Sequence, residues 1–77
     1  MMYTDSMRRA FHAIPAPKDF AVQLIDNDHF LTIKLNEYDF LGMTHDQKMQ
    51  ALQYVVQLKG ALEMEGAIVL VTREAVK

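Results

Sequence analysis

The stretch QLIDNDHFLTIKL, residues 23–35, decides the fold of this chain. Two apolar runs flank a short polar segment that holds Asp26, Asn27, Asp28 and His29. On either side of this segment apolar and polar residues alternate, which is typical of strands that bury one face. Asn and Asp also tolerate the positive φ that a two-residue hairpin turn requires. The stretch therefore predicts an antiparallel β-hairpin.

The alternation also predicts a register for this hairpin, with Asn27 and Asp28 as the two central turn residues. The strongly apolar alternates then face each other on one side of the sheet: Phe20 with Leu35, Val22 with Ile33, and Leu24 with Leu31. A slip of one residue would place Val22 opposite Thr32, which belongs to the other face. We therefore expect a first strand that begins near Phe20 and a second that ends near Leu35.

Length and composition restrict the function classes. The chain has 77 residues, of which 51% are hydrophobic, as expected for one folded domain with a modest core. It has no cysteine, which excludes a disulfide framework and a cysteine-based zinc site. Its formal charge of −2 is a poor balance for neutralising nucleic-acid phosphates. Residues 67–71 are the longest apolar run, too short for a membrane span, and no secretory signal pattern is present, so we expect a cytoplasmic protein.

A short helix is predicted before the hairpin, where Thr4 or Asp5 can cap it and Pro15 and Pro17 end it. Its apolar residues share one face: Met7, Ala10, Phe11 and Ile14. Such a short helix is marginal alone, so we expect this face to dock. The chain would then be a single domain over residues 1–77, with an N-terminal helix or arm at 1–17 and a ββαβ core at 18–77.

A long helix is predicted after the hairpin. Thr44 and Gln47 match a capping box, and Gly66 is well placed to end the helix after about Glu65. On a helical wheel the apolar residues form two neighbouring groups, the first being Ala51, Val55, Leu58 and Leu62 and the second Met49, Leu52 and Val56. Together they cover about half of the circumference, more than one sheet can bury.

The last predicted strand, Ala67 to Val71, is apolar on both faces, which is typical of a strand covered on both sides. The expected fold is α+β, in the order αββαβ, with a three-stranded sheet packed on the long helix and this strand at the sheet edge. A bare apolar edge invites aggregation, so we expect the N-terminal helix or a second copy of the chain to cover it. The residues expected to self-associate are Ala67, Val69, Val71, Met49, Leu52 and Val56.

Potential metal ligands occur in the hairpin segment, because Asp26 and Asp28 offer oxygen and His29 offers imidazole nitrogen. The further acids of a calcium-binding loop do not follow at the required spacing. In the predicted register Asp26 and His29 form a cross-strand pair beside the turn. We therefore assign all three to turn chemistry, expect no metal or other cofactor, and keep a metal site as the weaker alternative.

Catalytic motifs are not found in the sequence. His12 and His45 have no sequence neighbour that could form a nucleophile–base pair, and neither G-x-S-x-G nor H-E-x-x-H occurs. We therefore expect no enzyme activity. A metal-dependent enzyme would require one of the histidines to meet Asp26, Asp28 or Asp46 in space.

Ile25 and Phe30 are expected to pair on the hairpin face away from the core. With Lys34 nearby, this face could bind a partner, or single-stranded RNA by stacking, although the glycine–aromatic signature of RNA-recognition motifs is lacking. We expect the N-terminal helix to cover Ile25 and Phe30. Arg8 and Arg9 would then point outward as a small basic spot that a partner could use.

The function that these features favour is a small non-catalytic intracellular module that binds protein or regulates it, as a homodimer and without a membrane. One alternative is a single-stranded nucleic-acid-binding protein, whose basic face would consist of Arg8, Arg9, Lys18, Lys34 and Arg73. The other is a small subunit of a larger viral or bacterial assembly.

Overall fold

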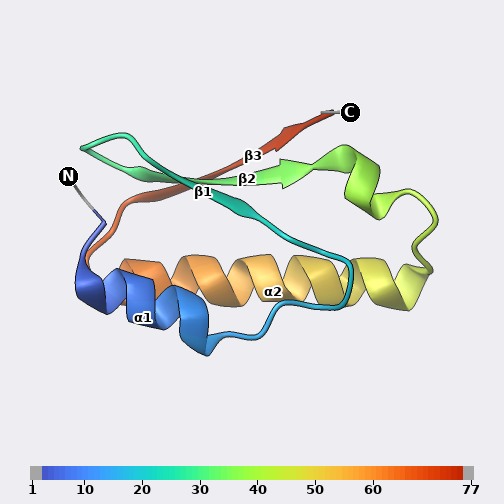
Figure 1. The fold of residues 1–77 in the computed structure, drawn as a ribbon, viewed down its shortest axis with the longest axis horizontal. Coiled ribbons are helices and arrows are strands. Elements are labelled where there is room, and N and C mark those ends of the chain that lie inside the picture. Colours follow the sequence, from blue (N-terminus) through green and yellow to red (C-terminus); the bar gives the residue numbers. More distant parts are fainter. Residues whose placement is uncertain (1–2, 76–77) are drawn as a thin grey trace.

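The computed structural model describes residues 3–75. In chain order the elements are α1 (Asp5–Ala13), β1 (Gln23–Asp26), β2 (Leu31–Asn36), the 3-10 helix η1 (Glu37–Phe40), α2 (His45–Met64) and β3 (Val69–Glu74). They form two layers, with the sheet above and both α-helices below it (Figure 1). The predicted α+β fold is confirmed.

The sheet has three strands in the order β1-β2-β3. β1 pairs with β2 antiparallel, and β3 pairs with β2 parallel, so α2 forms the crossover between two parallel strands. β3 therefore lies at one edge of the sheet, as predicted. The structure adds the 3-10 helix η1, which the sequence pattern did not indicate.

The hairpin register differs from the prediction by two residues. Leu24 lies opposite Ile33, and Ile25 lies opposite Thr32. The central turn residues are therefore Asp28 and His29, and the Asn27 N–H donates to the Phe30 carbonyl at 3.0 Å. Because side chains alternate with a period of two, this slip leaves every residue on its predicted face. The alternation of apolar and polar residues thus identified the buried face of the hairpin. It could not determine which residues of β1 and β2 lie opposite each other.

Strand β1 begins later than predicted, because Phe20 belongs to the core rather than to the hairpin. Its ring lies 5.4 Å from the ring of Phe40 and 6.2 Å from that of Tyr54, measured between centroids. Its N–H donates to the Pro17 carbonyl at 3.3 Å, which closes a turn before the strand. The aromatic contacts hold this segment below the sheet.

Helix α1 docks, but not where it was predicted. The Thr4 hydroxyl caps it by accepting from the Met7 N–H at 3.2 Å. Met7 is buried, and Phe11 and Ile14 pack against the same core. The helix lies alongside α2 on the inner side of the sheet (Figure 1). It therefore cannot cover the outer face of the hairpin, and that expectation is wrong.

Helix α2 has the predicted ends and the predicted excess of apolar surface. The Thr44 hydroxyl accepts from the Gln47 N–H at 3.2 Å, and the Gln47 side chain accepts from the Thr44 N–H at 2.8 Å. Gly66 ends the helix with a φ of 95°, which favours glycine. The first apolar group is buried against the sheet, whereas the second group remains exposed. No helix within residues 3–75 combines the length and the apolar character that crossing a membrane requires.

Candidate functional site

The predicted ligands in the hairpin do not form a metal site. One Asp26 carboxylate oxygen accepts from the Asp28 N–H at 2.9 Å, and the other accepts from the Tyr3 N–H at 3.1 Å. Asp26 lies opposite Leu31, so the predicted cross-strand pair of Asp26 with His29 is wrong. Asp28 adopts a φ of 69°, which Asp tolerates in a tight turn. Asp26 thus shapes the turn and also holds the segment that leads into α1.

The three histidines occupy separate parts of the fold. His12 lies on α1 with its ring edge-on to Phe11 at 5.4 Å, His29 lies in the hairpin turn, and His45 begins α2. Within the described part of the chain, no three His, Cys, Asp or Glu side chains gather where they could hold a metal ion. Of the predicted histidine–carboxylate combinations, His12 and Asp26 line one pocket between α1 and the hairpin, where no third ligand from residues 3–75 joins them.

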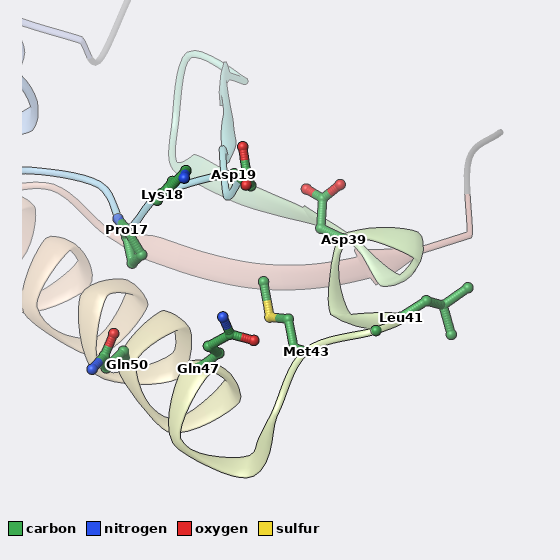
Figure 2. Close-up of a pocket in the computed structure, with 9 residues that line it drawn as sticks. Pro17, Lys18, Asp19, Asp39, Leu41, Met43, Gln47 and Gln50 are labelled. Carbon is green, nitrogen blue, oxygen red and sulfur yellow. The ribbon is translucent and has the colours of Figure 1, made fainter.

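A polar pocket of about 340 Å³ lies between the segment before β1, the segment after η1 and the first turns of α2 (Figure 2). Its lining side chains supply two carboxylates, one ammonium group and two carboxamides; the residues are Pro17, Lys18, Asp19, Asp39, Leu41, Gly42, Met43, Gln47 and Gln50. Leu41 points away from the hollow in Figure 2. These side chains give the pocket both hydrogen-bond donors and acceptors. The sequence pattern did not indicate it, because its residues come from three separate segments.

The outer face of the sheet is open and partly apolar. Ile25, Thr32 and Leu70 form one row across the three strands. Phe30 and Ile68 precede this row on the same face, because side chains two residues apart share a face. We call these five residues the outer face. Ile68 and Leu70 are 61% and 49% exposed, while Ile25 and Phe30 are half-buried.

The outer face contains two of the predicted binding residues, Ile25 and Phe30. The structure does not pair them with each other, contrary to the prediction. Ile25 lies opposite Thr32 rather than Phe30, so the predicted pair is wrong. Lys34 lies on the same side of the sheet and forms an ion pair with Glu74 at 2.9 Å. Ile68 and Leu70 were not predicted, although strict alternation from the buried Val69 would have indicated them.

A second open surface runs along the edge of β3 and the neighbouring side of α2. Leu52 and Val56 each lie two residues from Tyr54, about 200° around the helix. Tyr54 meets Phe20, which comes from the segment between α1 and β1. Leu52 and Val56 therefore face away from α1 and β1, toward the side on which β3 ends the sheet. We call β3 together with Met49, Leu52 and Val56 the β3 flank.

The residues predicted to self-associate divide between the core and this flank. Ala67 and Val69 are buried against the inner side, so their side chains belong to the core and are not exposed to a second copy. Val71, Met49, Leu52 and Val56 are 40–69% exposed and lie on the β3 flank. The second apolar group on α2, which is more than one sheet can bury, is thus exposed on the surface of the folded chain.

The five basic residues considered for nucleic acid do not form one face. Lys34 lies on the outer side of the sheet, while the Arg73 guanidinium lies 5.2 Å from the Phe40 ring on the inner side. Arg73 also bridges Glu37 at 3.2 Å, and Arg8 lies 3.6 Å from Asp5. These ion pairs reduce the charge that a phosphate backbone would meet. The arrangement therefore gives no support to nucleic-acid binding.

Burial raises the pKa of two tyrosines. Tyr54 has a raised pKa because its ring is buried beside Phe20. The pKa of Tyr3 is also raised by burial, and the Arg8 guanidinium partly opposes this shift. For both phenols the largest cause of the raised pKa is the loss of water around the buried ring.

Comparison with known proteins gives no match: neither a family model nor a curated protein nor a solved structure is significantly similar to the chain.

Proposed function

We propose that this protein is a small intracellular protein-binding module, without catalytic chemistry of its own, that regulates or assembles with its partner as a homodimer. The single observation that carries the proposal is the one-sided covering of the sheet. Both α-helices pack on the inner side, so the apolar side chains of the outer face and the β3 flank remain open. Exposed apolar patches of this kind mark interaction surfaces.

The shape of these surfaces favours protein over a small molecule. Small-molecule sites are concave and enclose most of the ligand surface. A sheet face and a strand edge instead offer broad contact, with polar residues around an apolar centre. On the outer face, the Asn27 side chain donates to the Thr32 hydroxyl at 3.2 Å, and Lys34 with Glu74 forms a charged rim. This pattern suits a protein partner.

Affinity capture from extract of the native host tests the protein-binding part. The intact chain would be compared with Leu70→Asp, which places a charge on the outer face, and with Met64→Asp, a control at an exposed position near the end of α2. We expect a partner that the parent and the control retain and Leu70→Asp loses. Equal capture by all three would contradict a role for the outer face.

Sedimentation equilibrium at micromolar concentration tests the homodimer. The expected species has twice the mass of the 8.9 kDa chain. A monomer across the whole concentration range would contradict the homodimer and leave the outer-face result unaffected.

A further inference from the structure

We propose that two copies of the chain pair through the open edges of their β3 strands, antiparallel about a twofold axis at Val71. The two three-stranded sheets then become one continuous sheet, and the α2 sides of the two β3 flanks pack on each other beneath it. This inference rests on the homodimer proposed above and names its contact.

The backbone of β3 has the geometry that such pairing requires. In a parallel pair, alternate residues direct their N–H and C=O groups to the neighbouring strand. Leu31 lies opposite Val69, and its N–H donates to the Ile68 carbonyl at 2.8 Å. Even-numbered residues of β3 therefore bond to β2, and Val69, Val71 and Arg73 direct their backbone groups to the open edge. These are the groups that a further strand would meet.

The charges along β3 are compatible with a register about Val71 and oppose registers centred farther along the strand. This axis places Val71 opposite its own copy, Leu70 opposite Thr72, and Val69 opposite Arg73. All these pairs are compatible, and the centre is apolar. An axis at Arg73 or Glu74 would place like charges directly opposite each other, which destabilises strand pairing. Arg73 also keeps its intrachain partner Glu37 in the proposed register.

Helix α2 is complementary to itself about the same axis. The twofold makes the two α2 helices antiparallel and brings Leu52 and Val56 of each copy to the contact. Where the twofold crosses α2 near Val56, each Lys48, eight residues before Val56, approaches Glu63 of the other copy, seven residues after it. A contact between identical surfaces needs such self-complementarity.

A stable dimer needs more contact than the edge of one strand provides. A standard interface buries ~800 Å² on each partner, about 15% of the 5263 Å² accessible surface of the chain. Strand pairing over the six residues of β3 covers an edge about 20 Å long and buries little side-chain surface by itself. The exposed α2 side chains of the flank supply the apolar contact that the edge lacks. Sheet and helix layers are therefore both needed, and the flank contains both.

Disulfide trapping tests the axis directly, because the chain has no cysteine of its own. In an antiparallel hydrogen-bonded pair the opposite Cα atoms lie about 5.5 Å apart, within the range that a disulfide spans. We expect Val71→Cys to form a covalent dimer under mild oxidation. Leu41→Cys, an exposed control outside β3, should react at least about tenfold more slowly, at the rate of random encounter. Equal rates for both variants would overturn the proposed axis.

A charge exchange tests the α2 contact by sedimentation equilibrium. We expect Glu63→Lys to raise the dimer Kd about tenfold, and the double variant Lys48→Glu/Glu63→Lys to recover most of that loss. Both variants lose the intrachain bridge from Lys59 to Glu63, so their difference isolates the contact with Lys48. A dimer that forms equally well in all variants and is not trapped at position 71 would overturn this inference and leave the homodimer standing. A monomeric parent chain would overturn both.

Discussion

The two faces of the sheet differ in burial although the same three strands form both. On the inner face Leu31, Ile33 and Leu35 are at most 2% exposed, under α1 and α2. On the outer face Ile68 and Leu70 remain open, although they are equally apolar. Composition therefore does not distinguish the faces; the position of the helix layer does. The open face and the open edge of β3 are the surfaces on which we place the function.

The largest expected effect comes from truncating one isoleucine on each face. Ile33→Ala leaves a cavity beneath the helices and should lower the free energy of unfolding by about 2–5 kcal/mol. Ile25→Ala, on the outer face, should lower it by less than about 1.5 kcal/mol, because its side chain is only half-buried. Urea denaturation of both variants measures the difference. Similar losses would show that the outer face contributes to the core as much as the inner face does.

A smaller effect is expected where a hydroxyl lies between apolar neighbours on the outer face. Thr32→Val removes the hydrogen bond from Asn27 to the Thr32 hydroxyl and should cost about 1 kcal/mol. Thr72→Val, at an exposed position on the same face, is the matched control and should cost less than about 0.5 kcal/mol. The two variants can be compared by urea denaturation. A stabilised Thr32→Val variant would mean that burial of the methyl group outweighs this hydrogen bond.

The charged rim of the outer face should contribute less still. The Lys34–Glu74 ion pair is partly exposed, so its coupling energy should be about 0.2–1 kcal/mol and should fall with added salt. A double-mutant cycle with Lys34→Met and Glu74→Gln measures it. A coupling energy that does not change between low and high salt would contradict a solvent-screened pair.

The weakest effect at neutral pH belongs to Tyr54, beneath the inner face. Because burial raises its pKa above the ordinary value of 10.0, the unfolded chain loses the phenol proton first as the pH rises. This contribution to stability is complete below about pH 10 and declines as the pH rises toward the folded-state pKa. Stability measured by urea denaturation should therefore decline less steeply above pH 10 in Tyr54→Phe than in the parent. Equal slopes for Tyr54→Phe and the parent would contradict the assignment.

Local features of the fold were predictable because neighbouring residues decide them. Thr44 and Gln47 form both hydrogen bonds of the capping box, and Gly66 has the positive φ that ends α2. The alternation around Leu31, Ile33 and Leu35 identified the buried face, because a strand directs successive side chains to opposite sides. The excess apolar surface of α2 was also predictable from neighbouring residues. Helical periodicity alone shows that the apolar arc is wider than one sheet can bury.

Of the candidate sites, the sequence indicated Ile25, Phe30 and the exposed group on α2, but not how they combine into surfaces. Ile68 and Leu70 join Ile25 only because β3 pairs with β2 in one register. Leu52 and Val56 join the edge of β3 only because α1 occupies the other side of α2. Both relations link segments that are far apart in the chain.

By itself, then, the sequence determined the two α-helices with the caps of α2, the presence of three strands, and the faces that the hairpin and α2 bury. The tertiary structure alone decided the pairing of the hairpin within that face and the docking of α1 on α2. The pattern of apolar residues is identical for registers two residues apart, so the choice depends on particular contacts such as those of Asp26 with Asp28 and Tyr3. An apolar helix face likewise has no preferred partner in the sequence, because apolar burial is non-directional. The segment QLIDNDHFLTIKL thus specified a hairpin and its inner face, and long-range packing left its outer face open.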